Sequence, residues 1–344
     1  MVAAICKEVS LTTSFADDAA ISSIYFGGGT PSLLSPQELN AILNAIKQKF
    51  IIAPNAEITL EANPDDVSIA ALQHWLQAGI NRLSLGVQSF NDAELKWMNR
   101  AHNATQSIKS IELIQAAGFK NFTVDLIYGS PLLSNDDLKK NIDRVLEKNI
   151  PHLSAYALTV EEKTALHHFI QKQKSPPVDE AHQESQFELL STLMENNGYQ
   201  QYEISNFARP GFRSMHNSSY WQGLPYYGFG PAAHSFDGHK TRRWNVANNA
   251  LYIQAIQNHT IPLQEEILTD TERLNEAIMI GLRTMEGVSL KELEQKFGAR
   301  QTNAVVKKAQ KYLGTGLMIE EDYCLRITKK GKFLADGIAA DLFF

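Results

Sequence analysis

Hydrophobic residues in the first two-thirds of the chain alternate between two spacings. Short apolar runs typical of strands, such as 22–27 and 121–129, are followed by stretches in which apolar residues recur every three or four positions, as in helices. A capping box at Ser35–Glu38, with Pro36 at the first helical position, predicts where one helix begins, and Gly79 predicts where another ends. Strands that alternate with helices of this length predict βαβ units and a parallel sheet.

Several segments have the length and composition of strands, and the stretches between them have helical spacing. The predicted strands are 22–27, 57–64, 82–90, 121–129, 152–160 and 201–207. Right-handed crossovers between parallel strands leave two arrangements open, a doubly wound sheet or a barrel. In both arrangements ligands bind beyond the C-terminal ends of the strands, so the residues at these ends are the first candidates for a binding site.

Glycines and polar side chains follow several of the predicted strands. Three glycines and a threonine follow the first strand, carboxylates lie at the ends of the second and fourth, an amide ends the third, and an arginine comes after a short helix. Because the C-terminal ends of parallel strands share one edge, we expect these residues to form a common rim. The members of this rim are Gly27, Gly28, Gly29, Thr30, Glu61, Asn63, Gln88, Arg100, Asp125 and Ala157.

The glycine run in "YFGGGTPS" does not by itself identify a ligand. A phosphate-binding P-loop needs lysine and then serine or threonine after its last glycine, whereas Thr30, Pro31 and Ser32 follow here. A dinucleotide fingerprint needs spaced glycines that open directly into a helix, and Pro31 delays the helix. A tight turn that binds no ligand is an equally good interpretation of the spacing alone. For Glu61 and Asp125 an exposed strand-end acid or a helix cap is the alternative, although Asp125 lies in the apolar run "TVDLIYG".

The alternation of strands and helices ends near residue 207. Residues 208–267 are rich in glycine, proline, aromatic residues and histidine and follow no clear period, which is typical of a functional or covering loop. His216 and His234 stand beside large aromatic residues, a combination that suits a flat apolar ligand, although a lone histidine is more often an ordinary polar residue. From 268 to 344, three helical stretches and a hairpin-like pair predict a winged-helix-like module.

Composition limits the classes of function. The length of 344 residues indicates one large domain and a smaller one. The chain has no apolar run of about 18 residues and no signal-peptide pattern at its start, so we expect no membrane span and a cytoplasmic location. A net charge of −6 argues against nucleic-acid binding, even by the winged-helix-like module. Cys6 and Cys324 are the only cysteines, too few for a disulfide framework or a metal cluster.

Several motifs in order carry a family resemblance: "YFGGGTPS", "EANP", "GVQSF", "VDLIYG", "HNSSYW" and "AHSF". They resemble those of the radical S-adenosylmethionine (SAM) proteins related to oxygen-independent coproporphyrinogen III oxidase, over nearly the whole chain. "HNSSYW" points to the HemW haem-chaperone branch. The implied fold is α/β, with a partial (β/α) radical SAM barrel in 1–207, an irregular His/aromatic segment in 208–267, and a C-terminal HemN-like helical domain, the winged-helix-like module, in 268–344.

The resemblance also implies roles for individual residues. The glycine turn of the family binds the methionyl end of SAM through backbone groups, which a residue without Cβ lets approach closely. The implied SAM-binding residues are Gly28, Gly29, Thr30, Glu61, Gln88, Arg100, Asp125 and Ala157. The family's His-Asn-x-x-Tyr-Trp motif is tied to haem binding. His216 is therefore the implied axial ligand of the haem iron, and His234 is a weaker second candidate.

One element of the family pattern is missing from this sequence. The family carries a Cys-x-x-x-Cys-x-x-Cys loop after its first barrel strand, whose three thiolates hold a 4Fe-4S cluster with one iron left open for SAM. No such loop occurs here, and Cys6 stands alone in "AAICKEVS". We therefore expect a barrel without its first strand and cysteine loop, and no radical SAM activity from the chain as written.

Two functions of different classes follow from the resemblance. One is a haem chaperone that binds haem and passes it to an acceptor protein, with no nucleic-acid partner and with peripheral association to membrane acceptors left open. The other is an oxygen-independent coproporphyrinogen III oxidase, which decarboxylates a porphyrin precursor by a radical mechanism. "HNSSYW" favours the chaperone. An inert fragment is the third alternative.

Overall fold

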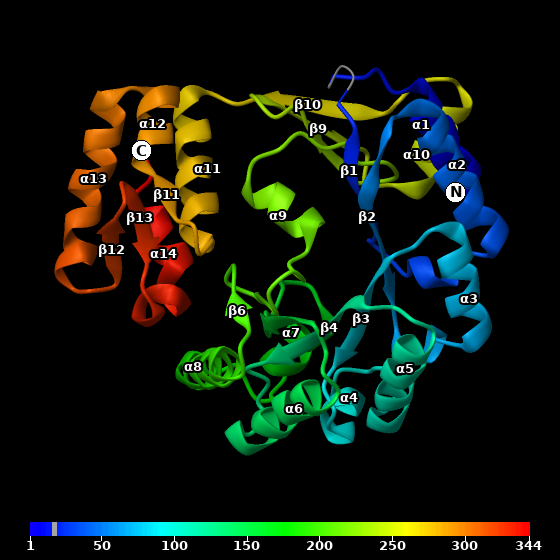
Figure 1. Ribbon diagram of the computed structural model, residues 1–344, viewed down its shortest axis with the longest axis horizontal. Helices are drawn as coiled ribbons and strands as arrows, with labels where there is room; N and C mark the ends of the chain where they lie inside the picture. The colour runs from blue at the N-terminus through cyan, green and yellow to red at the C-terminus, as the bar shows by residue number, and fades with distance from the viewer. Residues whose placement is uncertain (16–18) are drawn as a thin grey trace. The chain divides into compact units, whose positions relative to one another are not determined.

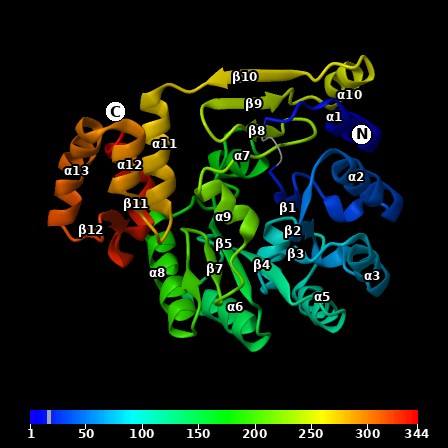
Figure 2. The ribbon, with the colours of Figure 1, turned by 45° about the horizontal axis from the view of Figure 1, so that its top comes forward.

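The computed structural model describes residues 1–15 and 19–344, which divide into two compact units. The sheet unit comprises residues 25–33 and 58–213, and the composite unit comprises residues 1–24, 34–57 and 214–344. Figures 1 and 2 show the elements of both units, and each unit is described by itself below. In the described part of the chain, no helix combines the length and apolar character needed to cross a membrane.

A seven-stranded sheet with the order β1-β2-β3-β4-β5-β7-β6 forms the frame of the predicted βαβ region. Its strands are β1 (Ile21–Phe26), β2 (Ile52–Ala62), β3 (Arg82–Gln88), β4 (Asn121–Tyr128), β5 (His152–Ala157), β6 (Gln200–Gln201) and β7 (Asn206–Ala208). The pairs β2–β3, β3–β4 and β4–β5 are parallel, as the alternation of strands and helices predicts.

The last predicted strand, 201–207, is wrong as a single element. Two short strands, β6 and β7, take its place, and β7 pairs antiparallel with both β5 and β6. The chain reverses between them because Asn206 N donates to the Glu203 carbonyl and Ser205 N donates to the Glu203 carboxylate. Side chains that hydrogen-bond to nearby backbone groups favour such turns over a continuous strand.

The helices of the βαβ region begin and end close to the predicted signals. Ser35 and Glu38 form the predicted capping box of α2, and Gly79 ends α3 in the left-handed conformation with φ 99°. In Figure 2, α3, α5 and α6 lie along one side of the strands of the sheet unit. The helices up to residue 196 are α1 (Val2–Leu11), α2 (Pro36–Lys49), α3 (Ile69–Ala78), α4 (Asp92–Trp97), α5 (Ala104–Ala116), α6 (Asn135–Glu147), α7 (Ala165–Gln171) and α8 (Glu180–Asn196).

Alternate residues of the parallel strands divide between an apolar and a polar face. The apolar set is almost completely buried and includes Leu60, Leu83, Leu85, Val124 and Leu153. The other set is polar and includes Thr59, Glu61, Ser84, Thr123, Asp125, His152 and Ser154. Parallel strands that are buried on both faces usually read as continuous apolar runs. A polar second face therefore marks the side of the sheet on which a binding site can form.

The segment 208–267 differs from the irregular loop expected from the sequence. It contains the helices α9 (Met215–Trp221) and α10 (Asn249–Gln257) and an antiparallel sheet of β8 (His234–Phe236), β9 (Thr241–Asn245) and β10 (Leu263–Ile267). These elements are so short that periodicity, which needs a window of about 11–18 residues, does not detect them.

The C-terminal segment has the three helices and the hairpin that the sequence predicts, and a further short helix, Ala335–Asp341, that it does not. Strands β12 (Met318–Glu321) and β13 (Cys324–Ile327) form the hairpin, and β11 (Val288–Ser289) pairs with β13. The helices are α11 (Asp270–Arg283), α12 (Leu290–Phe297), α13 (Ala299–Gly314) and α14 (Ala335–Asp341). One core cluster that includes Ile278, Val305 and Leu325 joins them.

Candidate functional site

The glycine turn after β1 combines two open positions with one crowded position. Gly28 and Gly29 have φ of +72° and +122°, a region that favours glycine, and apart from their chain neighbours no atom of the described residues lies within 4 Å of where a Cβ would stand. At Gly27 a Cβ would stand 2.6 Å from Tyr25 Cε1 and 2.9 Å from Glu61 Oε1. The turn therefore lets Glu61 lie against its backbone while Gly28 and Gly29 leave room for a ligand.

Four polar side chains form one cluster on the polar face of the sheet. Tyr25 Oη donates to Glu61 Oε1 at 2.7 Å, and Ser84 Oγ donates to Asp125 Oδ2 at 3.0 Å. Glu61 and Ser84 are register partners on β2 and β3, which brings the two hydrogen-bonded pairs together. Asp125 lies within β4 rather than past its end, three residues before Tyr128.

Burial changes the proton affinity of this cluster. It raises the pKa of Asp125 to about 6, although the hydrogen bond from Ser84 and the nearby Arg82 guanidinium act in the opposite direction. Asp125 Oδ1 is buried and accepts no hydrogen bond from the described residues. Burial and the Glu61 carboxylate also raise the pKa of Tyr25. A buried carboxylate oxygen without a partner is an acceptor that a ligand can satisfy.

The end of β3 has a strained conformation at Gln88. The pairing register of β3 and β4 shifts between Leu85 and Gln88, and Gln88 has φ of +67°. A Cβ at Gly86 would stand 2.9 Å from Gln88 Nε2 and 3.5 Å from Asn63 Oδ1, so glycine lets both amides approach the strand. Bulges and left-handed conformations of residues other than glycine are concentrated at binding sites, where they aim a side chain.

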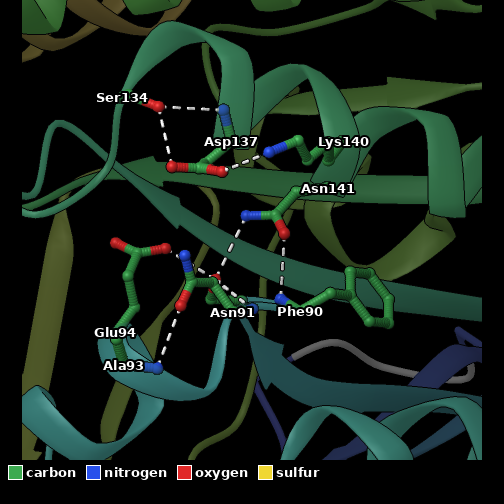
Figure 3. A network of polar contacts seen from close by, with 9 residues as sticks. Phe90, Asn91, Ala93, Glu94, Ser134, Asp137, Lys140 and Asn141 are labelled. Atoms are coloured by element: carbon green, nitrogen blue, oxygen red, sulfur yellow. Dashed lines mark hydrogen bonds and ion pairs between the residues drawn. The ribbon is translucent and has the colours of Figure 1, made fainter.

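A buried polar network fixes the turn that follows Gln88 (Figure 3). Asn141 of α6 accepts a hydrogen bond from Phe90 N at 3.0 Å and donates to Ser89 Oγ at 3.1 Å. Ser89 Oγ in turn donates to Glu94 Oε2 at 2.6 Å. Burial raises the pKa of Glu94, whose side chain is fully buried. The sequence gives no signal for this network, because its members lie on α4, on α6 and in the connecting turn.

The remaining residues of the predicted rim are less closely tied to the cluster. Arg100 follows α4 with an exposed side chain, and Ala157 is the last residue of β5. Asp125 pairs in register with Ser154, so alternation places Tyr156 rather than Ala157 on the face of Asp125. The structure thus brings together the glycine turn, Glu61 and Asp125. Gln88 ends the neighbouring strand β3 in a left-handed conformation, and Tyr156 is a neighbour of Asp125 that the sequence did not suggest.

The described residues do not fit the iron–sulfur cluster of the resembling family. Cys6 and Cys324 are both free and partly buried, and burial raises the pKa of the Cys6 thiol, which disfavours the thiolate. Within residues 1–15 and 19–344, no group of three or more His, Cys, Asp or Glu side chains is arranged to hold a metal ion. The described residues therefore supply no ligand set for such a cluster.

In the composite unit, His216 lies in the first turn of α9. Its Nδ1 is 3.1 Å from Ser23 Oγ of β1, and its ring meets that of Tyr220 edge to face at 5.0 Å. Tyr220 in turn contacts Tyr226 at 4.6 Å, and the Tyr226 ring lies 6.3 Å from Phe236. A half-buried imidazole beside an aromatic row can coordinate a metal held by a flat apolar ligand.

The carboxylate of Glu57 caps the start of α9, a role that the sequence did not suggest. Glu57 is 4% exposed. Its Oε1 accepts from Ser214 Oγ at 3.2 Å and from His216 N at 3.0 Å, and its Oε2 accepts from Met215 N at 3.1 Å. Backbone N–H groups at a helix start need such acceptors, and a negative charge there is favourable.

His234, the second histidine candidate, has a different environment. It begins β8 with an exposed side chain, and its ring stacks on that of Trp244 at 5.9 Å. Gly228 lies so close to the His234 carbonyl that a Cβ would overlap its oxygen at 2.0 Å. The His216 ring packs against Tyr220 and the His234 ring against Trp244, so each histidine is a separate candidate.

Comparison with known families and proteins identifies what this chain is similar to. The radical SAM superfamily matches residues 11–145, and the HemN C-terminal domain matches residues 268–334. The heme chaperone HemW of Lactococcus lactis is 33% identical over 330 residues, which cover 92% of this chain and 86% of the relative. The heme chaperone HemW of Bacillus subtilis is 34% identical over 324 residues, which cover 92% of this chain and 84% of the relative.

Among solved structures, the Escherichia coli coproporphyrinogen III oxidase HemN, described as a radical SAM enzyme, has a similar fold. The TM-score is 0.82 with 21% sequence identity, and the match covers 99% of this chain and 82% of that chain. At this identity the likeness concerns the fold alone. It confirms the predicted α/β radical SAM fold.

Proposed function

The chain belongs to the HemW family of heme chaperones within the radical SAM superfamily, and from this premise we propose that it binds haem and transfers it to an acceptor protein. The observation that carries the proposal is the extent of the match. Relatives named heme chaperone HemW align over more than nine-tenths of this chain and over 84–86% of their own length. The match confirms the predicted family and supports the predicted function.

His216 is the proposed ligand of the haem iron. Because its Nδ1 is hydrogen-bonded to Ser23 Oγ, Nε2 is the atom that would coordinate the iron. The aromatic row of Tyr220, Tyr226 and Phe236 supplies apolar surface for a porphyrin. Haem bound through an axial histidine gives a characteristic Soret absorption, so ligation can be measured directly.

A haem titration of single histidine variants tests this assignment. We expect His216→Ala to abolish most of the Soret change, and His234→Ala to weaken it less. His259→Ala, an exposed residue after α10, is the matched control and should titrate like the unmodified chain. An identical Soret change with and without His216 would show that His216 is not the ligand.

The polar cluster of the sheet unit is the proposed site for SAM. The open glycine turn suits a backbone that lies against a ligand, and the buried Asp125 Oδ1 can accept a hydrogen bond from it. Glu61, Gln88 and Arg100 are proposed to complete the site with Thr30 and Ala157. Calorimetric titration with SAM should detect binding to the unmodified chain and loss of at least about tenfold in affinity for Glu61→Ala, by the usual worth of a charged hydrogen bond.

An oxidase that decarboxylates coproporphyrinogen III is the alternative function. The solved structure that carries this activity in its description shares the fold but only 21% of the sequence, and this sequence has only two cysteines. An anaerobic assay with coproporphyrinogen III and SAM separates the alternatives. Decarboxylation by the chain would overturn the chaperone proposal, whereas haem binding without turnover supports it.

The proposed partners follow from the chaperone function. They are haem and one or more haem-acceptor proteins, reached in the cytoplasm or at a membrane surface by peripheral association. Transfer is tested by mixing the haem-loaded chain with an apo-haem protein and following the acceptor's own Soret band. Transfer no faster than the release of haem to an unrelated apoprotein would count against a chaperone.

A further inference from the structure

Two side chains far from "HNSSYW" in sequence contact the residue proposed to ligate haem iron. Ser23 of β1 reaches the His216 ring, and Glu57 of β2 holds the backbone of the same turn. All three residues lie in the composite unit. We infer that Ser23 and Glu57 are positioning residues that fix the tautomer and the orientation of His216 before haem arrives. The inference rests on the proposed haem-binding function and deepens it.

The role of Ser23 follows from the chemistry of imidazole. A neutral ring carries one proton, and only the nitrogen without a proton can bind a metal. If Nδ1 keeps the proton and donates it to Ser23 Oγ at 3.1 Å, Nε2 has its lone pair available for iron. In the opposite tautomer, Nε2 carries the proton and must lose it before it can ligate. A serine hydroxyl can either donate or accept. Only when it accepts from Nδ1–H does the contact favour the tautomer that is competent to ligate, and this is the direction that we assign to it.

The role of Glu57 follows from the length of α9. A helix of seven residues has few internal hydrogen bonds, so its first turn depends on outside partners. Glu57 is almost fully buried and accepts from Ser214, Met215 and His216 at once. A buried carboxylate that satisfies the N–H of the ligand residue itself fixes the position from which the imidazole projects.

Nuclear magnetic resonance of the haem-free chain tests Ser23 independently of haem. Two-bond ¹⁵N–¹H correlations distinguish the two tautomers of His216 at about pH 8.5, above the ordinary pKa of histidine. We expect the Nδ1–H form to dominate in the unmodified chain, a mixture of both forms in Ser23→Ala, and recovery of the Nδ1–H form in Ser23→Thr. Ser219→Ala is the matched control, because among the described residues the Ser219 hydroxyl of the same helix donates only to the Met215 carbonyl.

Haem affinity supplies the second measurement. We expect Ser23→Ala to weaken haem binding about tenfold, as is usual when the hydrogen-bond partner of a ligating histidine is removed, and Ser23→Thr and Ser219→Ala to leave it within about twofold. We expect Glu57→Gln to accelerate amide exchange at Met215 and His216, because an NH₂ group replaces one accepting oxygen, with a parallel loss of haem affinity. Thermal unfolding of each variant verifies that the fold is retained.

The outcomes separate this inference from the proposed function. A dominant Nε2–H tautomer in the unmodified chain, or no change of tautomer in Ser23→Ala, would overturn the positioning role even if His216 binds haem. Unaltered amide exchange in Glu57→Gln would overturn the role of Glu57. Conversely, if the tautomer responds to Ser23 as expected but His216→Ala binds haem normally, the haem ligand has been assigned wrongly and the tautomer result stands on its own.

Discussion

Gly27→Ala is the substitution that most directly tests how the glycine turn and Glu61 fit together. The new Cβ would stand 2.6 Å from Tyr25 Cε1 and 2.9 Å from Glu61 Oε1, well inside contact distance. The hydrogen-bonded pair must therefore move, and its 2.7 Å contact must lengthen or break. Over-packing of this kind costs about 1–3 kcal/mol, and the reduced entropy of the unfolded chain offsets about 0.4–1 kcal/mol. We expect a net loss of about 1–2 kcal/mol in the free energy of unfolding.

A double-mutant cycle with Glu61→Ala isolates the proposed cause. Without the Glu61 side chain, the Tyr25 ring can shift away from the new methyl group, so Gly27→Ala should cost at least about 1 kcal/mol less in that background. Urea denaturation followed by tryptophan fluorescence measures each variant, and Trp75 in α3 is a buried reporter in the same unit.

Gly28→Ala is the matched control for the cycle. Its Cβ meets no atom of the described residues within 4 Å, but its φ of +72° imposes backbone strain of about 1–2 kcal/mol. This cost has nothing to do with Glu61, so it should be the same in both backgrounds to within about 0.5 kcal/mol. The reasoning is refuted if Gly27→Ala is equally additive with Glu61→Ala, or if Gly27→Ala leaves stability unchanged.

Three further results are expected from the same geometry. Asn141→Ala should destabilise the chain by about 2 kcal/mol and weaken SAM binding through the turn after Gln88, whereas Lys140→Ala on the exposed face of α6 should change stability by less than about 0.5 kcal/mol. Asp125→Asn should raise the free energy of unfolding at neutral pH and should remove its dependence on pH, which denaturation curves at several pH values can measure. Anaerobic treatment with iron and sulfide should give no stoichiometric cluster absorption; such a band, with SAM cleavage on reduction, would contradict the cysteine argument.

The parallel sheet could be predicted because its signals are local. Alternating apolar residues, the capping box at Ser35 and the terminal glycine of α3 each lie within one element and act within it. The strand-end rule then placed Glu61 and Gln88 correctly at the ends of β2 and β3. It placed Asp125 too late in its strand, because β4 continues for three residues beyond it. Strand boundaries depend on the neighbouring strands, which a single segment does not reveal.

The partners of His216 could not be predicted from the sequence. Ser23 is 193 residues away and the hydrogen bond from the His216 backbone to Glu57 spans 159 residues. Neither residue has a pattern that distinguishes it from other strand residues. Short elements such as α9 and β8 are likewise decided by tertiary contacts, because seven or three residues carry too little intrinsic preference. The sequence alone therefore points to the His216 imidazole, whereas only the folded structure reveals that Ser23 and Glu57 contact this residue.

The pH dependence of stability tests the proposed role of Asp125 in a binding site. Its pKa is about 6 in the folded chain and about 3.9 in an unfolded one, so between these values the folded chain binds more protons. Linkage then requires that stability falls as pH rises from about 4 to about 6, by at most about 3 kcal/mol. Asp125→Asn should lack this fall and should be the more stable chain at pH 7, while binding SAM more weakly. An identical pH profile for both chains would show that the carboxylate is not destabilised by burial. A carboxylate on the polar face that lowers stability supports the proposed SAM site, because binding residues are often placed at a cost in stability.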